Sequence, residues 1–324
     1  MLKNNNNLSE KDIIYKYLKK LNFNKKETFN FTNDGSYIKK KKNKEIVVTN
    51  DTIIETIDFF KNDEPESIAQ KIITYNLSDL SSMGALPYSY TMSLSLPLGI
   101  NEKWISRFSN KLFYLQKKYK IFLLGGDISK SNQIYISANF FGYVNKKLLM
   151  QRNHCKKYDS IWVTGNIGES YIGLLLKQKK LNVDNNTKKY FINKYLYPKP
   201  CMLGSKIINY SCNCIDISDG FIGDLSKLIN NKLGAEIYYS KIPLSKKTKT
   251  LLRNKKIELN SLLYAGDDYE LIFTSSNNND KFIKKICKKN KIKITKVGRI
   301  IDKKGIFINE KKIKKNINSF QYFF

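Results

Sequence analysis

Six short segments carry the residues of this sequence that are best suited to chemistry. Each has an aspartate beside glycine, asparagine or a small hydroxyl residue, at a point where a strand or helix is expected to end. Mg²⁺ prefers carboxylate and water oxygens and usually shares them with substrate phosphates. The pattern therefore predicts a metal-dependent phosphoryl-transfer site. The segments are Asn33-Asp34, Thr49-Asn50-Asp51, Asn76-Leu77-Ser78-Asp79, Gly125-Gly126-Asp127, Asp216-Ile217-Ser218-Asp219-Gly220 and Gly266-Asp267-Asp268-Tyr269-Glu270.

Phosphoryl transfer needs metal ions, unobstructed backbone N–H groups and in-line positioning rather than a covalent catalyst. The sequence has neither a P-loop nor the His-Arg-Asp and Asp-Phe-Gly motifs of protein kinases. For any single aspartate here, a turn or capping role is about as common as metal binding. Ser218 and Asp219, for example, could cap the helix that follows them. It is the accumulation of such segments that favours a multi-metal phosphotransferase.

The chain is strongly basic, with 58 Lys+Arg against 28 Asp+Glu and a formal net charge of +30. Such a charge is typical of proteins that bind nucleic acid or anionic membranes. However, the arginines are confined to positions 107, 152, 253 and 299, and nucleic-acid recognition favours the planar arginine fork. We therefore expect no specific nucleic-acid partner, and attribute the lysine and asparagine excess to AT-rich coding. A lysine-rich nucleic-acid-binding protein on a degenerate enzyme scaffold is the alternative from a different functional class.

The five cysteines form no CxxC pair, and His154 is the only histidine. A structural zinc site is therefore not expected, and the odd cysteine count fits a reducing cytoplasm. The start of the chain lacks the apolar core of a signal peptide, and no stretch approaches about 18 apolar residues, so we expect no membrane span.

The elements predicted from periodicity divide the chain into two parts. The first, residues 1–150, reads β-α-β-α-β-β, with strands at 45–49, 90–96, 120–124 and 133–144 and helices at 66–83 and after Asn101. The second, residues 151–324, is an α/β unit that begins with a strand at 160–164, a Gly165–Gly168 turn and a helix. Later strands are expected at 270–274 and 293–300. The predicted class is α+β, with helices layered on sheets.

Five segments resemble the thiamine-monophosphate kinase family, in the same order and with the same separations. The resemblance extends from about Asn33 to Phe323. It implies the fold of the aminoimidazole-ribonucleotide-synthetase superfamily: an N-terminal α+β domain that binds metal and dimerises through its sheet, and a C-terminal α/β domain that binds nucleotide and substrate. The segments are Asn76 to Pro87 (NLSDLSSMGALP), Leu124 to Asp127 (LGGD), Val163 to Gly165 (VTG), Ile215 to Phe221 (IDISDGF) and Gly266 to Leu271 (GDDYEL).

The resemblance also implies an activity, the ATP-dependent phosphorylation of thiamine monophosphate to thiamine diphosphate, with several Mg²⁺ ions and a homodimeric enzyme. By matching motif, the implied metal ligands are Asp34, Thr49, Asn50, Asp51, Asp79, Asp127, Asp216 and Asp219. The implied ATP contacts are Gly126, Asp127, Arg152 and Ser218, and the implied substrate contacts are Asp58, Asp267 and Phe320. No acid–base catalyst is expected, because the acceptor is a phosphate that is already ionised near neutral pH.

Several positions depart from the family pattern. Asn33 and Asn50 stand where an aspartate and a threonine are usual, Cys201 replaces an arginine, and Asp58 replaces a histidine near the substrate. An extra carboxylate beside a phosphate is electrostatically unfavourable unless a metal ion or an amino group neutralises its charge. Another ATP-dependent synthetase of the superfamily, such as a selenophosphate synthetase, is the catalytic alternative, although no reactive Cys or Lys motif lies near the N-terminus.

Overall fold

The computed structural model describes residues 8–229 and 232–313. The chain forms two compact units. The N-terminal unit contains residues 1–80 and 86–145. The C-terminal unit contains residues 81–85 and 146–324.

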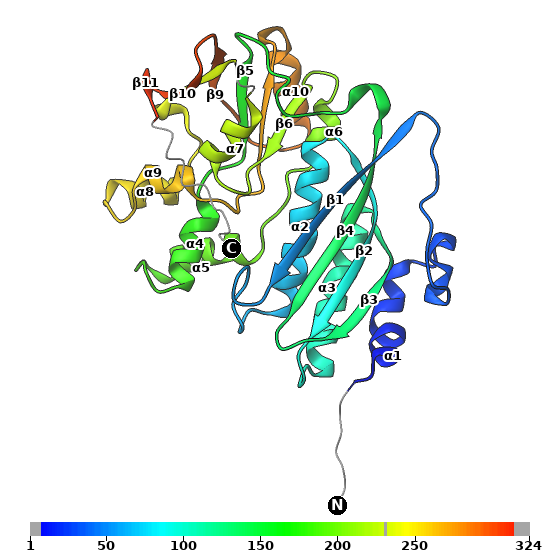
Figure 1. Ribbon diagram of the computed structural model, residues 1–324. Coiled ribbons are helices and arrows are strands. Elements are labelled where there is room, and N and C mark those ends of the chain that lie inside the picture. Colours follow the sequence, from blue (N-terminus) through cyan, green and yellow to red (C-terminus); the bar gives the residue numbers. More distant parts are fainter. Residues whose placement is uncertain (1–7, 230–231, 314–324) are drawn as a thin grey trace, which may run out of the picture. The chain divides into compact units, whose positions relative to one another are not determined.

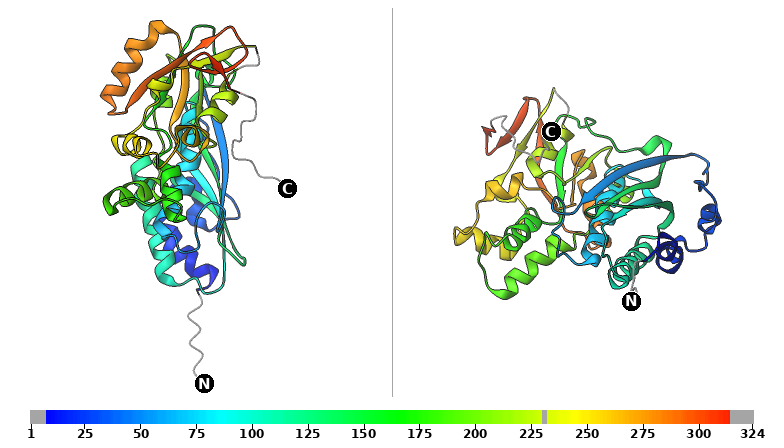
Figure 2. Two further views of the ribbon diagram at one scale, coloured as in Figure 1. Left: turned by 90° about the vertical axis from the view of Figure 1, so that its left-hand side faces the viewer. Right: turned by 60° about the horizontal axis from the view of Figure 1, so that its bottom comes forward.

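The N-terminal unit is a four-stranded sheet with helices on one face (Figures 1 and 2). Its elements are β1 (Lys44–Ile54), α2 (Pro65–Ser82), β2 (Leu86–Leu96), α3 (Glu102–Tyr119), β3 (Phe122–Lys130) and β4 (Tyr135–Asn145). The predicted β-α-β-α-β-β order is confirmed, and the strands lie in the order β1-β4-β2-β3. β2 and β3 are parallel, whereas β4 is antiparallel to both of its neighbours.

Helical turns precede this sheet: α1 (Glu10–Asp12), η1 (Ile13–Leu18), η2 (Lys19–Asn22) and η3 (Lys26–Phe31). They are anchored to the core, because the buried side chain of Gln116 in α3 donates to the carbonyl of Leu21 at 3.0 Å. α3 begins at Asn101 as predicted, since the Asn101 side chain accepts from the N–H of Trp104 at 2.9 Å.

β1 and β3 extend through segments that the sequence predicted as loops. Residues 49–51 lie inside β1 and residues 125–127 lie inside β3, not in loops that follow the strands. The prediction of loops was wrong because asparagine and glycine favour turns locally, whereas here the backbone of both segments pairs with neighbouring strands. Side chains of adjacent residues in these segments therefore point to opposite faces of the sheet.

The C-terminal unit is built on a seven-stranded sheet in the order β11-β10-β7-β9-β5-β8-β6. Among its described strands, parallel pairing occurs only between β7 and β10. Its strands are β5 (Ser160–Thr164), β6 (Asn213–Asp216), β7 (Gly234–Ile237), β8 (Leu271–Ser275), β9 (Ile294–Ile301), β10 (Gly305–Ile308) and β11 (Lys311–Lys312). Its helices are α4 (Glu169–Lys177), α5 (Asn185–Leu196), α6 (Gly204–Ile207), α7 (Phe221–Leu228), α8 (Lys246–Arg253), α9 (Leu259–Tyr264) and α10 (Asp280–Lys289), with short turns η4 (Lys146–Leu148), η5 (Tyr239–Lys241) and η6 (Asn277–Asn279).

Both faces of this second sheet are buried. Ile161 and Val163 of β5 pack in one apolar cluster with Phe221 of α7, while Trp162 packs in another with Ile283 of α10. This arrangement explains why β5 reads as a continuous apolar run rather than an alternating one.

Within the described residues, no helix is both long and apolar enough to cross a membrane.

Candidate active site

Three of the predicted site residues line one cavity in the N-terminal unit. Asp34, Gly126 and Asp127 border a space of about 380 Å³ beside the edge strand β3. Asn33 lies on the same wall, and apolar residues of the preceding helical turns close the cavity. A Cβ on Gly126 would lie 1.8 Å from the carbonyl oxygen of Met92, so only glycine fits there. The predicted metal and nucleotide residues of this segment therefore border a common hollow.

The residues of β1 divide between the two faces of the sheet. The hydroxyl of Thr49 donates to Oδ1 of Asn76 in α2 at 3.1 Å, which places Thr49 on the helix-covered face with Asp51. Asn50 faces the opposite side, where its amide donates to Oδ1 of Asn139 in β4 at 3.0 Å. The structure thus brings Thr49 and Asp51 to one face and does not bring Asn50 to them.

The side chain of Asp51 is a candidate metal ligand that the protein leaves partly unsatisfied. Its Oδ2 is buried and has no hydrogen-bond partner among the described residues. Burial, together with the nearby Asp58 carboxylate, raises the pKa of Asp51 to about 6. A hard divalent cation would satisfy this oxygen and offset the repulsion, so the site fits Mg²⁺ in its donor chemistry.

An amino group lies beside Asp58, the residue that departs most from the family pattern. The ammonium of Lys71 in α2 donates to the backbone carbonyl of Asp58 at 2.6 Å, and Lys71 is 1% exposed. Asp58 lies in the turn after β1, and its side chain folds back onto the end of that strand, where Oδ2 accepts from the N–H of Ile54 at 2.7 Å. Sequence reasoning missed Lys71. The available signal was a single charged residue in the otherwise uncharged run 67–78.

We expect Lys71→Met to lower the free energy of unfolding by about 1–3 kcal/mol, because the change leaves the carbonyl of Asp58 without its charged donor. Chemical denaturation monitored by circular dichroism measures this loss. Lys281→Met, at an exposed position of α10, is the matched control and should change stability by less than about 0.5 kcal/mol. Equal stability of the two variants would show that Lys71 does not hold this segment.

In the C-terminal unit, Asp216 ends β6 and leads into the turn that holds Ser218 and Asp219. The buried Asp224 organises this turn, because its Oδ2 accepts from the N–H groups of Ser218 at 3.0 Å and Asp219 at 2.9 Å. Lys227 makes ion pairs with both Asp219 and Asp224. The capping alternative for Ser218 and Asp219 was wrong, since α7 has Gly220 as its N-cap and no side-chain cap among the described residues.

The segment 266–270 packs directly on this turn. The N–H of Asp267 donates to the carbonyl of Ser218 at 2.9 Å. A Cβ on Gly266 would lie 1.9 Å from the same carbonyl oxygen, so a larger residue would separate the two segments. Asp267 adopts a left-handed backbone with φ of 67° and accepts from the Tyr269 hydroxyl at 2.8 Å. The predicted nucleotide residue Ser218 and the predicted substrate residue Asp267 are therefore neighbours.

The remaining predicted residues have less defined surroundings. Arg152 is exposed, although the flanking N–H groups of Gln151 and Asn153 donate to the carbonyls of Cys212 and Leu228 and fix its backbone. Asp79 is half-buried in the last turn of α2. Phe320 lies outside the described residues.

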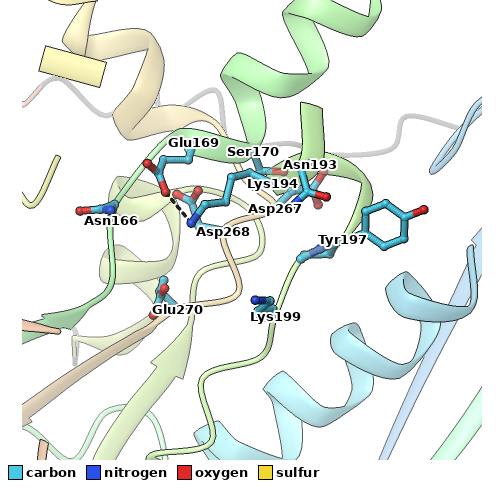
Figure 3. A pocket seen from close by; sticks show the side chains of 11 residues that line it. Asn166, Glu169, Ser170, Asn193, Lys194, Tyr197, Lys199, Asp267, Asp268 and Glu270 are labelled. Atoms are coloured by element: carbon cyan, nitrogen blue, oxygen red, sulfur yellow. Dashed lines mark ion pairs between the residues drawn. The ribbon is translucent and has the colours of Figure 1, made fainter. Parts of the chain in front are cut away.

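A pocket that sequence reasoning did not identify lies in the C-terminal unit (Figure 3). It has a volume of about 190 Å³ and is bordered by the start of α4, the end of α5 and the segment 267–270. Glu169 pairs with Lys194 at 2.8 Å across it, and Glu270 accepts from the Thr164 hydroxyl at 2.5 Å. Burial raises the pKa of Glu270 to about 7.

Across residues 8–229 and 232–313, no group of three or more His, Cys, Asp or Glu side chains is placed to hold a single metal ion. The predicted ligands nevertheless offer only oxygen atoms, which is the donor set that Mg²⁺ prefers.

Comparison with known proteins identifies the fold and the family. The AIR synthase related protein family matches with its N-terminal domain at residues 32–144 and its C-terminal domain at residues 158–311. A thiamine-monophosphate kinase of Buchnera aphidicola subsp. Schizaphis graminum is 38% identical over 326 residues, covering 97% of this chain and 99% of the relative. This chain belongs to the thiamine-monophosphate kinase family.

More distant members and solved structures agree. The thiamine-monophosphate kinase of Escherichia coli K12 is 34% identical, covering 71% of this chain and 70% of that protein. The crystal structure of thiamine-monophosphate kinase from Stenotrophomonas maltophilia K279a superposes with a TM-score of 0.81 at 28% identity, covering 87% of this chain and 90% of that one. A structure of AaThiL complexed with AMPPCP and TMP has a TM-score of 0.76 at 28% identity, covering 87% and 88%. The α+β fold class and the superfamily predicted from the sequence are confirmed.

Proposed function

We propose that this protein transfers the terminal phosphate of ATP to thiamine monophosphate and so forms thiamine diphosphate, with Mg²⁺ as the metal. The observation that carries this proposal is the 38% identity to a thiamine-monophosphate kinase over 97% of the chain. The aspartate-bearing segments support it, because they present oxygen ligands beside glycines on two sheets.

In this proposal, the aspartates at 34, 51, 79, 127, 216 and 219 and the hydroxyl of Thr49 hold the metal ions. Asn50 is a weaker candidate, since its amide is engaged with β4 on the opposite face from Asp51. Bound Mg²⁺ would screen the electrostatic repulsion between the two phosphate groups. This repulsion is the main obstacle to the reaction.

The protein's own groups would bind and orient the substrates. Gly126 lets β3 pack closely on β2, because a Cβ there would meet the carbonyl oxygen of Met92, and Asp224 fixes the N–H groups of the turn at Ser218. Arg152 is proposed to contact ATP, and Asp58, Asp267 and Phe320 the thiamine moiety. Because the acceptor phosphate is already ionised, no side chain is needed as a general base.

We propose further that the enzyme is a homodimer formed through the N-terminal sheet and that it acts in the cytoplasm. Ile46 and Val48 of β1 lie on the face away from the helices and are 42% and 56% exposed. A second copy would cover these side chains. Free thiols at all five cysteines suit a reducing compartment. Light scattering coupled to gel filtration tests the dimer, and a monomeric mass at micromolar concentration would contradict it.

An assay of ATP consumption with a panel of acceptors tests the activity. The purified chain receives ATP, Mg²⁺ and either thiamine monophosphate, thiamine or selenide as the sole acceptor. We expect turnover with thiamine monophosphate alone. Turnover only with selenide would support another synthetase of the superfamily and contradict the proposal.

Asn33→Asp should lower the Mg²⁺ concentration needed for half-maximal rate, with little change in the rate at saturation. Asn33 borders the same cavity as Asp34 and Asp127, so the added carboxylate would strengthen cation binding there before ATP arrives. Initial rates over a Mg²⁺ titration measure this effect. The control is Asn185→Asp, which adds the same charge at the exposed start of α5. If both variants keep the wild-type Mg²⁺ dependence, residue 33 does not face the metal.

A further inference from the structure

The candidate metal ligand Asp34 lies on a segment that has no helix or strand of its own. Residues 32–43 form a strap that joins η3 to β1, and its part from Asn33 to Ser36 borders the cavity beside β3 (Figure 1). A segment of this kind keeps one conformation only where contacts with other elements hold it. The position of the Asp34 carboxylate at the cavity therefore depends on what fixes the strap.

The backbone that enters the strap is strained. Phe29, Asn30 and Phe31 at the end of η3 all have left-handed backbones, with φ of 47°, 55° and 62°. This conformation is unfavourable for residues other than glycine, and three in succession persist only where surrounding contacts impose them. The start of the strap would therefore relax if those contacts were removed.

Glu27 makes one set of these contacts. Its carboxylate accepts from the hydroxyl of Tyr88 in β2 at 2.6 Å, and its backbone carbonyl accepts from the N–H of Tyr37 in the strap at 3.2 Å. The Tyr88 hydrogen bond is the main cause that lowers the pKa of Glu27, so the acceptor is an ionised carboxylate. Glu27 thus links the middle of the strap to β2.

Lys41 makes the second set, near the other end of the strap. Its ammonium lies 4.0 Å from the ring centre of Tyr143 in β4 and 4.8 Å from that of Tyr88. The two ring centres are themselves 4.9 Å apart, so one cation is shared between two aromatic side chains. The Tyr143 hydroxyl also donates to the backbone carbonyl of Lys39. Both strands therefore hold this end of the strap.

The Lys41 contact differs from the other lysine–ring contacts of the described residues. Most of those join near neighbours in the sequence, such as Lys117 and Phe113 at 4.3 Å. Lys41 instead meets rings of two different strands, and its 4.0 Å approach to Tyr143 is the closest within the described part of the chain. The geometry indicates a tertiary contact rather than a solvated side chain lying beside its neighbour.

We propose that Lys41 is a positioning residue: its ammonium, held by the Tyr88 and Tyr143 rings, latches the strap so that Asp34 stays at the metal cavity. This inference rests on the function proposed above and deepens it, since Asp34 is a metal ligand in that proposal. The latch itself holds neither metal nor substrate. It raises the fraction of molecules in which the Asp34 carboxylate is in place, and the apparent affinity for the metal falls when that fraction falls.

Hydrogen exchange of the strap amides in the metal-free protein tests the latch. Lys41→Met keeps an unbranched side chain and removes its charge, so residues 32–43 should exchange about threefold faster than in wild type. Lys41→Arg keeps a cation that can stack on the rings and should restore the wild-type rate. Lys40→Met is the matched control, because it removes the same charge from the neighbouring exposed residue of the strap. Equal exchange in Lys41→Met and Lys40→Met, or no rescue by arginine, would overturn the inference.

Binding of Mn²⁺ in the presence of a non-hydrolysable ATP analogue tests the effect on the metal without turnover. The electron paramagnetic resonance signal of the free ion measures this binding, and Mn²⁺ accepts the same oxygen ligands as Mg²⁺. Lys41→Met should bind Mn²⁺ about two- to threefold more weakly than Lys40→Met. Because coupling is reciprocal, bound Mn²⁺ should also slow exchange of the strap in wild type. Equal affinity of the two variants, no Mn²⁺ binding by wild type, or strap exchange that Mn²⁺ leaves unchanged would each contradict the role of Lys41.

Phosphate transfer by the wild-type protein separates the latch from the proposed function. If wild type phosphorylates thiamine monophosphate while Lys41→Met matches Lys40→Met in exchange and in Mn²⁺ affinity, the latch is overturned and the proposed function stands. If wild type shows the latch and its coupling to Mn²⁺ but transfers no phosphate, the latch is supported and the proposed function is overturned.

Discussion

Asp79→Asn and Asp219→Asn should each lower kcat by about 100- to 1000-fold, because each removes one ligand charge from the metal ions that screen the two phosphates. Loss of such a ligand typically costs several kcal/mol of transition-state stabilisation. The fold should persist. Asp219 is half-buried, and its partner Lys227 retains its ion pair with Asp224 at 2.9 Å. Steady-state rates at saturating ATP and thiamine monophosphate measure the effect.

Asp302→Asn is the control for these two variants. Asp302 also pairs with a lysine, Lys157 at 2.8 Å, but it is 63% exposed and belongs to no predicted site segment. Its removal should leave kcat unchanged. If both site variants retain activity within about tenfold, a difference of about 1.4 kcal/mol, these aspartates are not metal ligands.

Asp51→Asn should abolish activity and at the same time stabilise the metal-free protein at pH 7.5 by about 1–3 kcal/mol. The pKa of Asp51 is raised from 3.8 to about 6, chiefly by burial and then by Asp58. The folded state therefore disfavours the ionised form, and the stability that the neutral form contributes is complete below about pH 3.8 and lost as the pH rises through about 6. The asparagine has no such charge, so its advantage should shrink towards pH 4.

Denaturation curves of the metal-free proteins at pH 4 and pH 7.5 measure this difference. Asp184→Asn serves as the control, because the N–H of Thr187 lowers the pKa of Asp184 and ionisation there favours the folded state. That variant should not be stabilised at pH 7.5. Added Mg²⁺ should raise the melting temperature of wild type more than that of Asp51→Asn, and an equal shift would contradict metal binding at this residue.

Local sequence signals predicted much of the architecture. The cap at Asn101, the apolar run of β5 and the Gly165–Gly168 turn before α4 each depend on neighbouring residues, and all three appear as predicted. The ends of β1 and β3 were not predictable in this way. Residues 49–51 and 125–127 favour turns by composition, and only their pairing with other strands keeps them extended.

The candidate site likewise contains some residues that the sequence reveals and others that only the folded structure reveals. Motif residues such as Asp216 and Asp267 are visible in the sequence because their types and spacing match the family. Lys71, Asp224 and Glu169 are not visible, since each acquires its role through contacts with groups brought close by folding. Lys71 donates to the backbone carbonyl of Asp58, a contact that the sequence alone does not reveal.

Isotope transfer from ATP tests the central claim most directly. The wild-type protein is incubated with ATP labelled in its terminal phosphate, Mg²⁺ and thiamine monophosphate, and the product is separated and examined by phosphorus NMR. We predict that the label appears in the terminal phosphate of thiamine diphosphate, in a one-to-one ratio with the ADP formed. Label released only as inorganic phosphate, with thiamine monophosphate recovered unchanged, would contradict the account.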